Sequence, residues 1–309
     1  MSRAFIKGLY VTGGLLLILL LPSCATTNLH STPPVQSYQD LQGLEKNLQT
    51  SDQPALKVMT LNVAHGRGTS FHQLLQYSDE TVENLDKISA LLNDTTPDII
   101  ALQEVDGPSF WSGNFNHVEY LANRSVFTHS VQASHVDAFG LSYGTALMSR
   151  LVLDDPQAVT FDPSLSPVPK GFVVSTVRWP GSAGIDIDVV SIHLDFMSGS
   201  IRKKQSDELI AVLRARNNRV VIMGDLNAEW HQKNSSIQYL AEKLGLSAYQ
   251  PENRELVTFP PLGERLDWIL ISPGLEFRSH RVIGHGVSDH RGVVAELILS
   301  RPSFAQYGK

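Results

Sequence analysis

The sequence predicts an α/β protein in which two β-sheets are faced with helices. Short apolar runs rich in β-branched residues alternate with a few stretches of helical periodicity, and short connections join them. Hydrophobic residues make up 42% of the 309 positions, which is enough for a sizeable core and excludes a fully disordered chain. This pattern alone does not distinguish a two-sheet sandwich from a single sheet between two helical layers.

The expected elements follow from the periodicity along the chain. Apolar residues between 82 and 92 recur at helical spacing, so a helix should end before Pro97. Further helices are expected at 200–216, where Ser200 can cap the first turn, and at 237–244. Apolar runs predict strands at 56–63, 98–105, 144–150, 172–179, 185–194, 219–223, 266–271, 276–282 and 293–299.

The first 23 residues are typical of a secretory signal peptide. Arg3 and Lys7 precede an apolar run at 9–21, which is too short to span a membrane comfortably. The run ends in Leu-Pro-Ser-Cys, which resembles the lipoprotein cleavage site at which the cysteine receives a lipid. Cys24 is the only cysteine. We therefore expect a membrane-anchored lipoprotein outside the cytoplasm, on the outer membrane in a Gram-negative host. A secreted protein with an incidental cysteine is the alternative.

The rest of the chain divides by composition. Residues 24–54 are rich in Thr, Ser, Gln, Pro and Asn, which predicts a flexible tether, with a short helix near 38–48. Residues 55–300 form the expected folded domain, and 301–309 a C-terminal tail. One cysteine excludes an intramolecular disulfide framework and a cysteine-based zinc site.

Polar residues follow the apolar strands at the points where those strands end. A carboxylate there is costly unless it is paired, hydrogen-bonded or metal-bound. Each residue taken alone has a structural explanation, such as a turn, a helix cap or a core histidine. Together they indicate a single cleft, to which we assign Asn62, Glu104, His193, Asp225, Asn227, Asp267, Asp289 and His290.

In this order the motifs resemble the endonuclease/exonuclease/phosphatase superfamily. They are an Asn after the first strand, Gln-Glu at 103–104, a His on a strand, Gly-Asp-Leu-Asn at 224–227, Asp beside Trp at 267–268, and Ser-Asp-His at 288–290. The resemblance implies a four-layer αββα sandwich of two packed mixed sheets flanked by helices. It also implies a metal-dependent hydrolase of phosphoester bonds.

The resemblance assigns a role to each residue. Glu104, Asn62 and Asp289 would bind Mg²⁺ or Mn²⁺, since Mg²⁺ prefers oxygen ligands. Asp225 would orient or deprotonate the attacking water. Asn227, His193 and Tyr143 would contact the phosphate. His290 would contact the phosphate or act as an acid or base, and Asp267 would orient the ring of His290. His65 is either a cleft residue or a turn residue.

The substrate is less specified than the reaction. An endonuclease is the first hypothesis, although the net charge is −6, or −8 once Arg3 and Lys7 are cleaved off, and no basic arm is present. A sphingomyelinase-like enzyme acting on phospholipid head groups, a phosphomonoesterase, and a non-catalytic envelope binding protein on the same scaffold are the alternatives. The expected partners are thus a nucleic-acid or phospholipid phosphoester and, through the lipid, the membrane. No protein partner is predicted.

Overall fold

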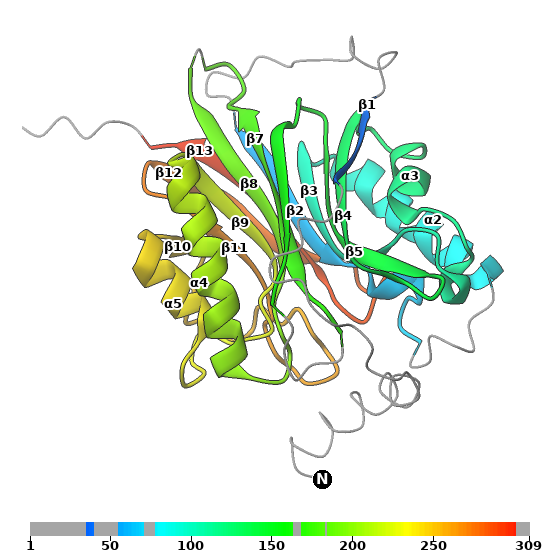
Figure 1. The fold of residues 1–309 in the computed structure, drawn as a ribbon. Coiled ribbons are helices and arrows are strands. Elements are labelled where there is room, and N and C mark those ends of the chain that lie inside the picture. The colour runs from blue at the N-terminus through cyan, green and yellow to red at the C-terminus, as the bar shows by residue number, and fades with distance from the viewer. Residues whose placement is uncertain (1–34, 40–54, 71–77, 163–167, 183, 301–309) are drawn as a thin grey trace, which may run out of the picture.

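The computed structural model describes residues 35–39, 55–70, 78–162, 168–182 and 184–300. Two packed β-sheets form the centre of the molecule, and helices cover the outer face of each sheet (Figure 1). This arrangement confirms the four-layer αββα sandwich. Leu56, Val58, Ile99, Val189 and Met223 are among the fully buried residues between the sheets.

The first sheet has seven strands in the order β1-β4-β5-β3-β2-β13-β12. Only β2 and β3 pair in parallel; the other pairs within this sheet are antiparallel. The strands are β1 (Val35–Gln39), β2 (Leu56–Asn62), β3 (Ile99–Asp106), β4 (His129–Ala138), β5 (Leu141–Ser149), β12 (Leu275–Ile283) and β13 (Gly292–Leu299).

The second sheet has six strands in the order β10-β11-β9-β8-β7-β6. Here β8 and β9 are parallel and their neighbours are antiparallel. The strands are β6 (Asp154–Thr160), β7 (Gly171–Arg178), β8 (Asp186–His193), β9 (Arg219–Asp225), β10 (Ser247–Ala248) and β11 (Asp267–Ile271).

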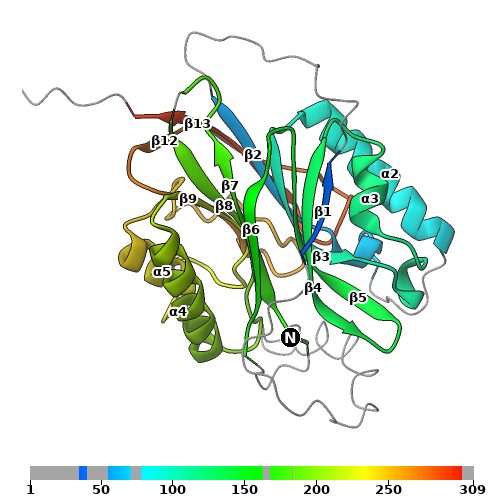
Figure 2. The same cartoon turned by 45° about the horizontal axis from the view of Figure 1, so that its top comes forward.

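Each sheet carries its own helices, as both views show (Figures 1 and 2). The seven-stranded sheet is covered by α2 (Ser78–Thr95) and α3 (His117–Ala122), and the six-stranded sheet by α4 (Gly199–Arg216) and α5 (Ser236–Leu244). Separate apolar clusters fill the two helix–sheet layers. Two short 3₁₀ turns, η2 (Ala64–Gly66) and η3 (Phe110–Ser112), follow β2 and β3.

The structure departs from the sequence-based expectation at a few elements. Within the expected tether, residues 35–39 form β1 and pair with β4, because an extended segment can satisfy the open edge of that sheet. The helix expected near 38–48 is thus wrong at Tyr38 and Gln39, which lie in β1. Ser198, not Ser200, precedes the first turn of α4. Strands β4 and β6 and helix α3 were not expected.

The signal peptide, Cys24, the rest of the tether and the C-terminal tail lie outside the described residues. Among the helices that the structure describes, none has the length and apolar character needed to cross a membrane.

Candidate active site

Three neighbouring strands of the six-stranded sheet bring polar side chains together. His193 ends β8, Asp225 ends β9 and Asp267 begins β11. In the register of the sheet His193 lies opposite Asp225, and Asp225 lies opposite Asp267. Residues opposite each other in neighbouring strands point to the same face of a sheet. The three side chains therefore stand in a row.

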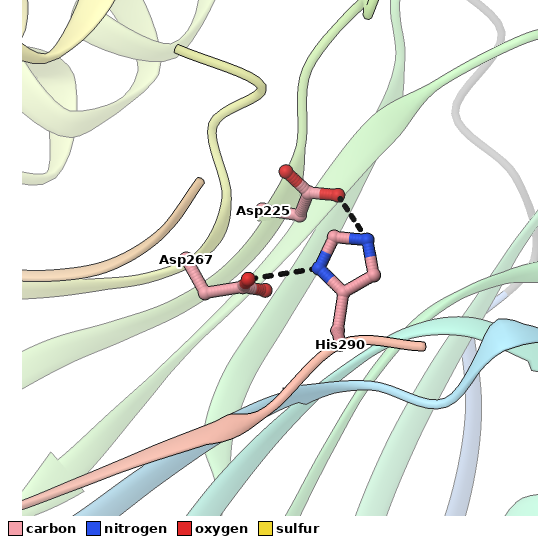
Figure 3. A group of neighbouring side chains, drawn as sticks. All are labelled: Asp225, Asp267 and His290. Atoms are coloured by element: carbon pink, nitrogen blue, oxygen red, sulfur yellow. Dashed lines mark hydrogen bonds and ion pairs between the residues drawn. The ribbon is translucent and has the colours of Figure 1, made fainter. Parts of the chain in front are cut away.

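Asp225, His290 and Asp267 form a buried charged cluster (Figure 3). Nδ1 of His290 lies 2.8 Å from Oδ2 of Asp267, and its Nε2 lies 3.8 Å from Oδ2 of Asp225. Burial alone would lower the pKa of His290, but Asp267 and Asp225 raise it to about 10. Burial raises the pKa of Asp225 to about 7, although His290 opposes the rise. The imidazole is therefore charged at neutral pH.

The loop before β11 fixes the orientation of this cluster. Oγ1 of Thr258 accepts hydrogen bonds from the backbone N–H groups of Leu266 (2.9 Å) and Asp267 (3.0 Å). The ring of Phe259 packs on the ring of His290, with 4.7 Å between centroids. Asp267 is fully buried, and within the described residues its Oδ1 has no hydrogen-bond partner. One carboxylate oxygen orients the imidazole while the other stays an open acceptor.

Glu104 stands on a β-bulge, where the register between β3 and β5 shifts, and its φ is +50°. A bulge re-aims a side chain away from the regular alternation of a strand. Burial would raise the pKa of Glu104, but its neighbours hold it well below the ordinary value, so the carboxylate is ionised. Four nitrogen-bearing side chains surround it: His65 (3.4 Å), Lys170 (3.6 Å), Arg67 (3.7 Å) and His193 (3.9 Å).

Lys170 and His193 connect Glu104 with Asp225. Nζ of Lys170 lies 3.1 Å from Nε2 of His193, and that nitrogen lies 3.5 Å from Oδ2 of Asp225. Burial lowers the pKa of His193 well below its ordinary value, and Lys170 lowers it further. The neutral ring can accept a hydrogen bond from the ammonium group. The two sheets thus contribute to one continuous polar site.

Asn62 and Asp289 reach the same site from the seven-stranded sheet. Nδ2 of Asn62 donates to Oδ2 of Asp225 at 3.1 Å. The guanidinium of Arg67 lies 2.6 Å from Oδ2 of Asp289 and 3.7 Å from Glu104. Arg67 therefore neutralises two carboxylates at once.

Asn227 follows Asp225 on the same loop. Its backbone N–H donates to Oδ1 of Asp225 (2.9 Å), and its side-chain amide donates to the carbonyl of Leu194 (2.9 Å). The residue holds a φ of +48°. These bonds fix the backbone that carries Asp225.

Tyr143 lies in the aromatic wall beside Glu104. Its ring stacks on Trp111 at 5.6 Å between centroids and meets the ring of His65 edge-on at 4.8 Å. Nδ1 of His65 lies 2.7 Å from Asp106, and its Nε2 faces Glu104 at 3.4 Å. His65 is therefore a site residue that also occupies a turn, with a φ of +55°.

Sequence reasoning missed Arg67, Lys170 and Asp106. Asp106 is fully buried and also accepts hydrogen bonds from Trp111 Nε1 (2.8 Å) and Ser112 Oγ (2.6 Å). It follows Glu104 by two positions, so the strand-end pattern contained a signal for it. The two cations lie on loops without any periodic pattern, and only the fold places them.

The oxygen donors of Glu104, Asp289 and Asn62 are the ligand types that Mg²⁺ and Mn²⁺ prefer. Arg67 between the two carboxylates shows that this position attracts positive charge. A second possible donor set has ligand atoms within 4.8 Å of one another and consists of Asp225, Asp267 and His290. In that set the facing atoms of His290 and Asp267 are engaged with each other. The oxygens of the first set are engaged as well, Asp289 with Arg67 and Oδ1 of Asn62 with the backbone N–H of Ala64 (3.0 Å), so both sets are candidate cation sites.

Comparison with solved structures finds the same fold. An endonuclease/exonuclease/phosphatase from Beutenbergia cavernae is 21% identical, with a TM-score of 0.64 over 80% of this chain and 72% of that chain. A sphingomyelinase C from Streptomyces griseocarneus is 17% identical (TM-score 0.57, 79% and 99% covered). A humanized D. rerio TDP2 is 18% identical, with a TM-score of 0.56 over 79% of this chain and 99% of that chain. The curated proteins yield no significant match.

A sequence model of the endonuclease/exonuclease/phosphatase family matches residues 59–290, the span that carries Glu104, Asp225 and His290. Members of that family are hydrolases of phosphoester bonds and typically depend on a divalent metal. The chain belongs to the endonuclease/exonuclease/phosphatase family.

Proposed function

We propose that this chain is a divalent-metal-dependent phosphodiesterase that acts outside the cytoplasm. The observation that supports this most is the meeting of Glu104 and Asp225 at one histidine. Nε2 of His193 lies 3.9 Å from the first carboxylate and 3.5 Å from the second. Nε2 of the charged His290 lies 3.8 Å from the same oxygen of Asp225. Acidic, basic and cationic groups thus lie together, as phosphate ester hydrolysis requires.

In this proposal Glu104 and Asp289, with the carboxamide oxygen of Asn62, hold Mg²⁺ or Mn²⁺. When bound, the ion neutralises charge on the phosphate and stabilises the leaving oxygen. Glu104 is ionised because its cationic neighbours lower its pKa, so it is ready to bind a cation without losing a proton.

The remaining residues supply binding and proton transfer. Asp225 orients the attacking water and takes its proton, since two donors, from Asn62 and Asn227, hold its carboxylate in place. His290, charged and oriented by Asp267, donates to a phosphate oxygen. Lys170 and His193 add contacts to the phosphate, as does the Asn227 amide. This site recognises a phosphodiester and does not by itself separate nucleic acid from phospholipid.

The proposal is tested by hydrolysis of bis-p-nitrophenyl phosphate with the purified full chain. Glu104→Gln and Asp225→Asn should each lower kcat/KM by about 10²–10³-fold or more, because each removes a charge at the reacting centre. Glu83→Gln, on an exposed helix position, is the matched control and should behave as wild type. Chelation should abolish activity and Mg²⁺ or Mn²⁺ should restore it.

Full activity in both site variants, or in the presence of chelator, would refute the proposal. A wild-type chain inert towards DNA, RNA, sphingomyelin, inositol phosphates and the soluble diester would support the non-catalytic binding protein instead.

We also propose that Cys24 carries the lipid that anchors the enzyme. Cys24→Ser should release the processed protein from the membrane fraction, and a variant that stays membrane-bound after leader cleavage would refute the anchor. Secretion of the wild-type protein would support the alternative.

A further inference from the structure

Two phenylalanines project into solvent at the active-site end of the seven-stranded sheet. Phe139, in the tip that joins β4 to β5, is 77% exposed, and Phe110, in η3, is 58% exposed. The backbone N–H of Phe110 donates to the carbonyl of Gly140 at 3.0 Å. The two rings therefore belong to one surface, which we name the phenylalanine patch. Exposed aromatic side chains grouped in this way mark interaction sites.

A series of ring contacts joins the phenylalanine patch to the active site. The rings of Phe110 and Trp111 lie 6.4 Å apart, and those of Trp111 and His65 lie 5.1 Å apart. Nε2 of His65 then lies 3.4 Å from the carboxylate of Glu104. Two rings, those of Trp111 and His65, therefore connect the patch with the proposed metal-binding carboxylate.

The chain around the patch carries no basic side chains. No Lys or Arg occurs at 107–118 or 137–149, the segments that contain Phe110 and Phe139, and the one charged residue in them is the exposed Asp137. Nucleic acid and anionic lipid are both held by lysine and arginine. An apolar rim without Lys or Arg instead matches a zwitterionic lipid surface, into which aromatic side chains insert at the boundary of head groups and acyl chains.

Strand β1 places the N-terminal side of the chain at the same end. Val35 pairs with Ala133 and Gln39 pairs with His129, while β4 runs from His129 towards the hairpin tip. The first residue of β1, Val35, is therefore the one that lies nearest to the β4–β5 hairpin tip (Figure 2). Cys24 precedes Val35 by 11 residues, which span at most about 40 Å when extended. A lipid on Cys24 would therefore leave the patch within reach of the same membrane.

We propose that the phenylalanine patch docks on a zwitterionic phospholipid surface, so that the active site acts on the phosphodiester of a lipid head group. This inference rests on the proposed phosphodiesterase function. In such a surface the phosphodiester lies directly above the acyl chains. Rings of Phe110 and Phe139 that enter the acyl boundary would leave Glu104 and its neighbours at the level of the phosphate.

Docking is tested first without reference to activity. In the full chain bound to phosphatidylcholine vesicles that contain doxyl-labelled lipid, Phe139→Trp should add a quenched emission to that of the native tryptophans. Val152→Trp is the matched control: Val152 is 47% exposed and follows the opposite end of β5, about 26 Å along the strand. Quenching that is equal at the two positions would overturn the docking proposal.

The second measurement compares two substrates. In the Phe110→Ser/Phe139→Ser variant, the ratio of vesicle sphingomyelin hydrolysis to soluble-diester hydrolysis should fall about tenfold or more, because burial of one Phe changes partitioning by about that factor. Val126→Ser/Val152→Ser should keep the wild-type ratio. An unchanged ratio in the patch variant would overturn the inference. If the patch variant lost only the hydrolysis of single-stranded DNA, the inference would also be overturned, and the patch would be assigned to base stacking. A wild type without soluble-diester activity would refute the phosphodiesterase proposal, while the quenching result would still decide the docking.

Discussion

His135 should make the protein sensitive to acid through its position between the two sheets. It lies on β4 and is 7% exposed. Its Nδ1 lies 3.0 Å from Oγ1 of Thr160 on β6, and its Nε2 lies 2.9 Å from Oγ1 of Thr145 on β5. Each threonine hydroxyl can donate or accept, so the neutral ring, with one donor and one acceptor nitrogen, satisfies both contacts in either tautomer. Burial lowers the pKa of His135 to about 3, and the nearby Lys170 contributes.

The size of the effect follows from proton linkage. The unfolded chain protonates this histidine near pH 6.5 while the folded protein keeps it neutral, so the unfolded state binds the extra proton between pH 6.5 and 3. Stability is therefore complete above pH 6.5 and falls as the pH decreases through this window. Between pH 7 and pH 5 the loss attributable to His135 is about 2 kcal/mol.

Urea unfolding of wild type and His135→Gln at pH 5, 6, 7 and 8 measures this loss. The glutamine amide can donate to one threonine and accept from the other, so the variant should retain the bridge without the titration. Between pH 7 and pH 5 the free energy of unfolding of the variant should fall by about 2 kcal/mol less than that of the wild type. The exposed His285→Gln is the control and should follow wild type. Parallel stability profiles for wild type and His135→Gln would refute the reasoning.

Two further variants examine the charge balance of the site. Arg67→Met removes the cation shared by Glu104 and Asp289, so Mn²⁺ should bind at least about tenfold more tightly, as measured by calorimetry. The metal-free variant should melt at a lower temperature than the wild type. Weaker Mn²⁺ binding would contradict the ligand assignment. Asp267→Asn removes the charge that orients His290, so kcat should fall about 10- to 100-fold with KM little changed, while Tm decreases because the buried imidazolium loses a partner. A changed KM with an unchanged kcat would instead indicate a role in binding.

The positions of the site residues along the chain could be predicted, but not their contacts. Asn62, Glu104 and Asp225 each end an apolar strand, and that pattern is visible in the sequence because buried strands are apolar and their ends are not. Which strand ends lie together depends on register. His193 and Asp225 meet because β8 and β9 pair in parallel, a long-range pairing that no local pattern encodes.

The missed strands have physical explanations. Strand β6 lies at the edge of its sheet and contains Pro156, a residue that edge strands tolerate and that argues against a strand in the sequence. Strand β4 buries polar side chains such as Gln132 and His135, so it lacks an apolar run. Thr160 and Thr145 contact both ring nitrogens of His135, and Asn116 donates to Oε1 of Gln132, although Nε2 of Gln132 has no partner among the described residues. Such partners become visible only in the fold.

The backbone of the site explains why the missed residues matter. His65, Glu104 and Asn227 all hold a positive φ, which costs about 1–3 kcal/mol per residue and persists only where surrounding contacts impose it. Those contacts are polar: Asp106 holds His65, Lys170 and other cationic side chains surround Glu104, and the backbone at Asn227 donates to Asp225. Two of these partners, Asp106 and Lys170, are residues that sequence reasoning did not identify. Loss of one such partner should disturb the orientation of the site as well as its charge.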